Sequence, residues 1–123
     1  MDLKGISILV IDDDPDSREL LGVMLEACGA TVRVVSSARG GVVACDEARP
    51  DVIVSDLAMP ENDGDSFLRA LRTRAACVRV PAIAVTGYAH HRARALAEGF
   101  DDVLLKPVER EVLCDLVGQH VAV

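Results

Sequence analysis

Side chains that could do chemistry stand at the ends of four short apolar runs. They are, in chain order, Asp12-Asp13-Asp14, Asp56, Thr86 and Lys106. If the apolar runs are parallel strands of one sheet, their carboxyl ends share one edge, where open α/β sheets bind ligands. We therefore expect one pocket in which the carboxylates hold a divalent cation and Asp56 acts as a nucleophile.

The elements that would position these residues follow from alternating strand and helix signals. Apolar, often β-branched runs predict strands at 7–11, 31–35, 52–55, 81–85 and 102–105, with helical patterns between them. In the first helix, Asp14 suits the N-cap and Pro15 the first helical position. Later helices are expected from Ser36 or Ser37, from Asp65 or Ser66, over about 89–98, and after Pro107. In the last of these, we expect Val112, Leu113, Leu116 and Val117 to form the buried stripe.

The predicted fold class is α/β: a single doubly wound (βα)5 sandwich with a five-stranded parallel sheet in the order 2-1-3-4-5. Parallel neighbours need crossovers, and these are almost always right-handed. This order places the first and third strands together at the switch point, so Asp12, Asp13 and Asp56 should meet there. Thr86 and Lys106 should reach the rim of the same acidic hollow.

Composition narrows the class of protein. A chain of 123 residues suits one compact domain, and its net charge of −7 argues against a nucleic-acid partner. Its apolar runs are too short for a membrane span, so we expect no membrane insertion. The cysteines lack metal-ligand spacing and predict reduced thiols of a cytoplasmic protein. They are Cys28, Cys45, Cys77 and Cys114.

With these residues in view, the chain resembles the receiver domains of bacterial two-component response regulators, from about Ile6 to Gly118. We take residues 1–123 as one such domain. The resemblance implies that Asp56 accepts a phosphoryl group from a phosphohistidine of a sensor kinase or histidine phosphotransfer domain. It implies Mg²⁺ bound by Asp13, Asp56 and the backbone carbonyl of Ala58, with Asp12 holding coordinated waters. Thr86 and Lys106 would contact the phosphoryl oxygens, and the Lys106-Pro107 bond would be cis.

Elementary chemistry agrees with these roles. A carboxylate attacks an anionic phosphoryl group poorly unless the accumulating charge is neutralised. Mg²⁺ joins carboxylate and phosphoryl oxygens, and Lys106 adds a flexible point charge. Because phosphoryl transfer needs mainly alignment and charge stabilisation, a metal, a lysine and a hydroxyl suffice. We therefore expect a phosphoacceptor that catalyses only its own phosphorylation and dephosphorylation, not an enzyme with an external substrate.

Two departures from the family pattern affect the expected mechanism. Val103 stands where many receivers have a Tyr or Phe that rotates inward, so signalling should pass through the loop after Thr86 and the face made by the last two helices and the strand between them. Ala58 cannot orient water, and Tyr88 either shields the acyl phosphate, which would slow self-dephosphorylation, or lies flat on a docking surface. His90 and His91 are expected to be solvated rather than metal ligands.

Alternative functions stay open at this point. A receiver-shaped interaction module that no longer uses phosphate is the second reading, and a flavin-binding or metal-dependent hydrolase relative is the third. Because the chain ends near the last helix, we expect output through another protein. The chain would then be either a single-domain regulator or a receiver cut from a hybrid histidine kinase.

Overall fold

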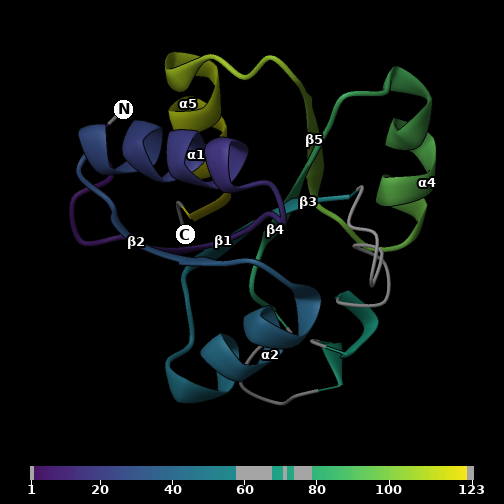
Figure 1. The fold of residues 1–123 in the computed structure, drawn as a ribbon, viewed down its shortest axis with the longest axis horizontal. Helices are drawn as coiled ribbons and strands as arrows, with labels where there is room; N and C mark the ends of the chain where they lie inside the picture. The colour runs from purple at the N-terminus through teal and green to yellow at the C-terminus, as the bar shows by residue number, and fades with distance from the viewer. Residues whose placement is uncertain (1, 58–67, 71, 74–78, 122–123) are drawn as a thin grey trace.

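A five-stranded parallel sheet forms the centre of the computed structural model, which describes residues 2–57, 68–70, 72–73 and 79–121 (Figure 1). The strand order is β2-β1-β3-β4-β5, and this confirms the predicted fold class. The strands are β1 Ser7–Ile11, β2 Thr31–Val35, β3 Val52–Asp56, β4 Ala82–Thr86 and β5 Asp102–Leu105. The helices are α1 Pro15–Ala27, α2 Ala38–Glu47, the 3₁₀ helix η1 Ala89–His91, α4 Arg92–Ala97 and α5 Arg110–Val121.

Two central strands run one residue further than their sequence patterns predict. We expected strands to end at Ser55 and Val85, whereas β3 includes Asp56 and β4 includes Thr86. Asp56 pairs with Val85 in the parallel ladder, and the backbone N–H of Leu57 donates to the Val85 carbonyl at 3.2 Å. The polar residues are thus the last members of buried strands, which fixes their backbones within the sheet.

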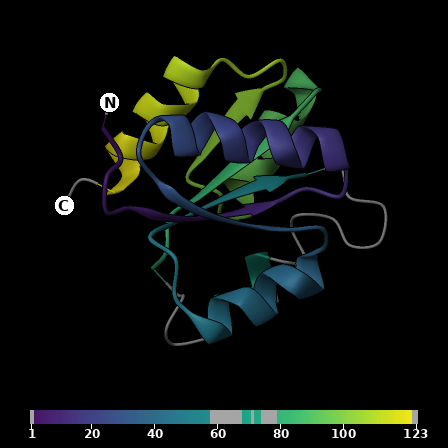
Figure 2. The same ribbon diagram turned by 60° about the vertical axis from the view of Figure 1, so that its left-hand side comes forward.

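Helices cover both faces of the sheet, so the strands are buried on both sides. Figure 2 shows α1 and α5 on one face and α2 on the other. On the first face, Ile8 and Val10 of β1 pack with Leu25 of α1 and Leu113 of α5. The opposite faces of the strands pack against α2 and α4. The two apolar layers leave the carboxyl edge of the sheet as the place where buried polar groups gather.

Local sequence signals explain where the helices begin. Asp14 is the N-cap of α1, and its carboxylate accepts from the Ser17 N–H at 3.1 Å, with Pro15 at the first helical position. Ser37 caps α2 in the same way, accepting from the Gly40 N–H at 3.0 Å. The predicted helix start at Asp65 or Ser66 lies outside the described residues. In α5 the expected stripe is wrong at Val112, which is exposed, while Leu113 and Val117 are buried.

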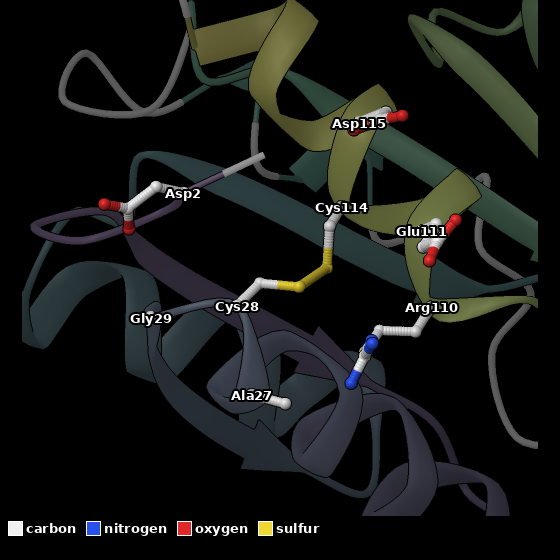
Figure 3. Close-up of a pocket in the computed structure, with 8 residues that line it drawn as sticks. All are labelled: Asp2, Ala27, Cys28, Gly29, Arg110, Glu111, Cys114 and Asp115. Atoms are coloured by element: carbon white, nitrogen blue, oxygen red, sulfur yellow. A yellow bond between two sulfur atoms is a disulfide. The ribbon is translucent and has the colours of Figure 1, made fainter.

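A disulfide joins Cys28 to Cys114, and the prediction of reduced thiols is wrong for this pair (Figure 3). Cys28 is the C-cap of α1, and Cys114 lies on the side of α5 that packs against α1, with a Cα–Cα distance of 6.7 Å. The two cysteines are separated by 86 positions in the sequence, so no local pattern indicated the pairing. Cys45 is buried in the core, and Cys77 lies outside the described residues.

Candidate functional site

Three carboxylates converge at the carboxyl edge of the sheet, as the strand order predicts. Oxygen atoms of Asp12, Asp13 and Asp56 lie within 4.8 Å of one another. Asp12 is 0% exposed and Asp56 is 5% exposed, while Asp13 is open to solvent. Asp12 and Asp13 directly follow β1, and Asp56 ends the adjacent strand β3. Burying two carboxylates beside a third is unfavourable unless a cation offsets their repulsion.

Asp12 is held by groups that the sequence patterns did not identify. Its Oδ2 accepts from the Ser17 hydroxyl at 2.5 Å, and its Oδ1 accepts from the Asp14 N–H at 2.9 Å. Its backbone carbonyl accepts from the Arg18 guanidinium at 3.0 Å. Ser17 and Arg18 lie in the first turn of α1, next to the acidic run, and that proximity is the signal that could have indicated them. These bonds fix the Asp12 carboxylate toward the cluster.

Lys106 supplies a positive charge between two of the carboxylates. Its Nζ lies 3.7 Å from Asp12 Oδ2 and 3.8 Å from Asp56 Oδ2. Its backbone N–H donates to the Thr86 carbonyl at 2.8 Å, which ties the start of the loop after β5 to β4. The Lys106-Pro107 peptide bond is cis, as the resemblance implied.

The charges of this cluster fit a bound dication. Three carboxylates and one ammonium group leave a formal charge of −2. The lysine stands beyond hydrogen-bonding distance of both oxygens, so it compensates the carboxylates only in part. Closely spaced carboxylate oxygens are the ligands that hard cations such as Mg²⁺ prefer. Ala58, whose carbonyl was predicted as a further ligand, lies outside the described residues.

Thr86 is buried at the end of β4, and its hydroxyl is already bonded. Thr86 Oγ1 lies 2.9 Å from His91 Nδ1 and accepts from the Tyr88 N–H at 3.2 Å. The expectation that both histidines are solvated is therefore wrong for His91, which is half-buried, and holds for His90, which is exposed. The 3₁₀ turn η1 brings residue 91 back to residue 86, because the His91 N–H bonds to the Tyr88 carbonyl at 3.1 Å.

The two departures from the family pattern have clear places in the structure. Val103 is buried in the core at 3% exposure, and its aliphatic side chain stands where many receivers have an aromatic residue. Tyr88 is 56% exposed, and its ring lies beside the rings of His90 and His91, at centroid distances of 5.7 and 5.2 Å. This exposure favours the docking-surface reading of Tyr88, and its effect on phosphoryl lifetime stays a prediction.

Two surface hollows lie near α1, and they differ in character. A largely apolar groove of about 300 Å³ runs beside Lys106 and Pro107, with Leu20 and Met24 of α1 on its other wall. A wider, open depression of about 650 Å³ surrounds the Cys28–Cys114 disulfide, and charged residues such as Arg110 and Glu111 line it (Figure 3). The groove adjoins the carboxylate cluster, whereas the depression lies by the C-terminal end of α1.

Comparisons with known proteins agree with this geometry. Residues 8–118 match the family model described as the response regulator receiver domain. The chain is 43% identical over 120 residues to an uncharacterized 14.6 kDa protein of Leptolyngbya boryana, covering 96% of this chain and 92% of that one. It is 35% identical to the transcriptional regulatory protein GltR of Pseudomonas aeruginosa, covering 92% of this chain but only 48% of that protein.

Solved structures show the same fold. A putative response regulator from Chloroflexus aurantiacus superposes with a TM-score of 0.91 at 25% identity, covering 98% of this chain and 100% of that one. The receiver domain of the sensor histidine kinase PA1611 from Pseudomonas aeruginosa, which has a magnesium ion coordinated in its active site cleft, gives 0.88 at 31% identity, covering 95% and 98%. The strand order, the buried acidic edge and the match over 8–118 lead to one conclusion: the chain belongs to the response regulator receiver domain family of two-component signalling.

Proposed function

We propose that Asp56 accepts a phosphoryl group from a phosphohistidine, in a reaction that needs Mg²⁺. The observation that carries the proposal is the position of Lys106, whose Nζ stands 3.8 Å from the Asp56 carboxylate within a cluster that still has a net negative charge. An incoming phosphoryl group adds negative charge at this point. The site must therefore combine an ammonium group with a dication to accept it.

The residues have separate roles in this proposal. Asp56 attacks, Lys106 stabilises the charge on the phosphoryl oxygens, and the Thr86 hydroxyl donates to one of those oxygens once the group is bound. Asp12, Asp13 and Asp56, with the Ala58 carbonyl, would hold Mg²⁺ directly or through its waters. The ion would supply a hard positive centre shared by carboxylate and phosphoryl oxygens. The magnesium-containing PA1611 receiver domain supports this assignment.

The phosphoryl donor would be a histidine kinase or a histidine phosphotransfer domain, and the output would be a separate protein or domain. We place the output change on the loop after Thr86 and on the α4-β5-α5 face. Among the described residues, Tyr88, Leu96 and Leu105 expose large apolar side chains on these elements. Phosphorylation can shift them only by stabilising one arrangement more than another. A cytoplasmic location belongs to the same proposal. As a separate finding, none of the described helices has the length and apolar character needed to cross a membrane.

Intact-mass spectrometry after exposure to acetyl phosphate and Mg²⁺ tests the proposal. We expect the parent to gain the mass of one phosphoryl group and Asp56→Asn to gain none. Asp115→Asn, which removes a carboxylate from the exposed side of α5, should behave like the parent. Omitting Mg²⁺ should abolish the gain. A parent that gains no mass would instead favour an interaction module that works without phosphate.

A further inference from the structure

The hydroxyl of Thr86 is engaged by His91, a residue outside the set assigned to phosphoryl transfer. Thr86 is wholly buried, and a buried hydroxyl requires an acceptor for its hydrogen. Tyr88 N–H uses the hydroxyl oxygen as an acceptor, and among the described residues His91 Nδ1 is the acceptor that the hydroxyl hydrogen can reach. This network assigns the Nε2–H tautomer to His91, with Nδ1 unprotonated.

Both partners of this bond have further contacts. The Thr86 carbonyl accepts from the Lys106 N–H at 2.8 Å, within the β4–β5 ladder. The His91 ring contacts the rings of His90 and Tyr88, at centroid distances of 4.5 and 5.2 Å. Because the Thr86 backbone is bonded within the sheet, the hydroxyl would turn toward Asp56 by rotation of the Thr86 side chain, and that rotation breaks the bond to His91.

We propose that His91 is a positioning residue that holds the Thr86 hydroxyl away from the phosphoryl position and so sets how readily Asp56 is phosphorylated. This inference rests on the proposed function of Thr86. The hydroxyl has one hydrogen, so it donates either to His91 Nδ1 or to a phosphoryl oxygen. Phosphorylation therefore competes with the Thr86–His91 hydrogen bond. When that hydrogen bond breaks, the cluster of the Tyr88, His90 and His91 rings on the surface is released from Thr86. A local event at Asp56 thereby reaches the loop before α4.

The chain offers variants that separate the hydrogen bond from ring packing. His91→Phe keeps a ring and removes the acceptor, whereas His91→Asn places an amide oxygen near the position of Nδ1. We expect His91→Phe to raise the rate of phosphorylation by acetyl phosphate about two- to tenfold, the value of one neutral hydrogen bond. His91→Asn should stay close to the parent rate. His90→Phe, which alters the exposed neighbour, is the matched control and should leave the rate unchanged.

A double-mutant cycle with Thr86→Ala completes the test. In that background the hydroxyl is absent, so His91→Phe should no longer change the rate. Equal rates for the parent and His91→Phe, or the same acceleration with and without the Thr86 hydroxyl, would overturn the proposal. If the parent itself is not phosphorylated, the proposed function fails, and the role of His91 fails with it.

Ring NMR spectra of isotope-labelled protein examine the bond without any phosphoryl donor. In the parent, His91 should be the Nε2–H tautomer with its Nδ1 shift moved by an accepted hydrogen bond, and Thr86→Ala should abolish that displacement. A protonated Nδ1 in the parent would contradict the assigned direction of the bond and overturn the proposal.

Discussion

The two ends of α1 differ in the interactions around them: a cluster of charged side chains lies at one end and a covalent bond at the other. Beside its N-terminus, Asp12, Asp13 and Asp56 crowd together with Lys106 as a partial counter-charge. At its C-terminus, Cys28 is linked covalently to Cys114 of α5, beside the buried contacts between the two helices. At one end, like-charged groups lie where the proposed cation and phosphoryl group would bind. At the other end, a covalent bond joins α1 to α5 away from that site.

This difference separates a charged site from a covalently linked pair of helices within one small fold. Like-charged groups at the carboxyl edge cost folding free energy, and that cost must be offset elsewhere in the molecule. The α1–α5 layer is suited to do so, since a disulfide across a long loop restricts the unfolded chain.

The largest expected change in the free energy of unfolding comes from removal of the disulfide. Replacing Cys28 and Cys114 together by serine should lower the free energy of unfolding by about 2–4 kcal/mol in the absence of reductant. The rate of Asp56 phosphorylation should stay near that of the parent, because the change lies at the far end of α1. Urea denaturation gives the first quantity and intact mass the second.

Reductant provides the control for this comparison. It should lower the stability of the parent to that of the double serine variant and leave the variant unchanged. If untreated protein is alkylated at both Cys28 and Cys114, or if the variant is as stable as the parent, no disulfide joins α1 to α5.

Mg²⁺ should have the next largest effect on the free energy of unfolding, and it should act at the N-terminal end of α1. A concentration one hundred times its dissociation constant should raise the free energy of unfolding by about 2.7 kcal/mol. Asp13→Asn should lose most of this gain, and Asp115→Asn should retain it. Reduction of the disulfide should not alter the increment, and an increment that depends on the redox state would show that the two ends are coupled.

The smallest expected effect on stability comes from the repulsion among the carboxylates of the site. In the presence of a chelator, Asp13→Asn should stabilise the protein by up to about 1 kcal/mol, because it removes one repelling carboxylate in a position screened by solvent. Chemical denaturation checks the sign. A destabilised Asp13→Asn would mean that the metal-free cluster is not under electrostatic stress. Glu19→Gln, which removes an exposed carboxylate from α1, controls for a general effect of reduced net charge.

Much of the fold could be predicted because its signals are local. Short apolar runs and caps such as Asp14 and Ser37 depend on residues a few positions apart, and the structure confirms them. The convergence of Asp12, Asp13 and Asp56 followed from strand order, since carboxyl ends of parallel strands share one edge. The exact ends of β3 and β4 were missed by one residue, because ladder bonds to neighbouring strands extend them.

The amino-acid sequence by itself determined the strand and helix order, the acidic edge and the identity of the polar residues at it. Only the tertiary structure decided that Cys28 meets Cys114 and that His91 returns to Thr86. The first contact joins cysteines 86 positions apart and depends on how α1 and α5 are rotated against each other. The second depends on a 3₁₀ turn that tightens the start of the following helix. Neither helix rotation nor turn type leaves a periodic pattern in the sequence, because both are set by packing against neighbouring elements.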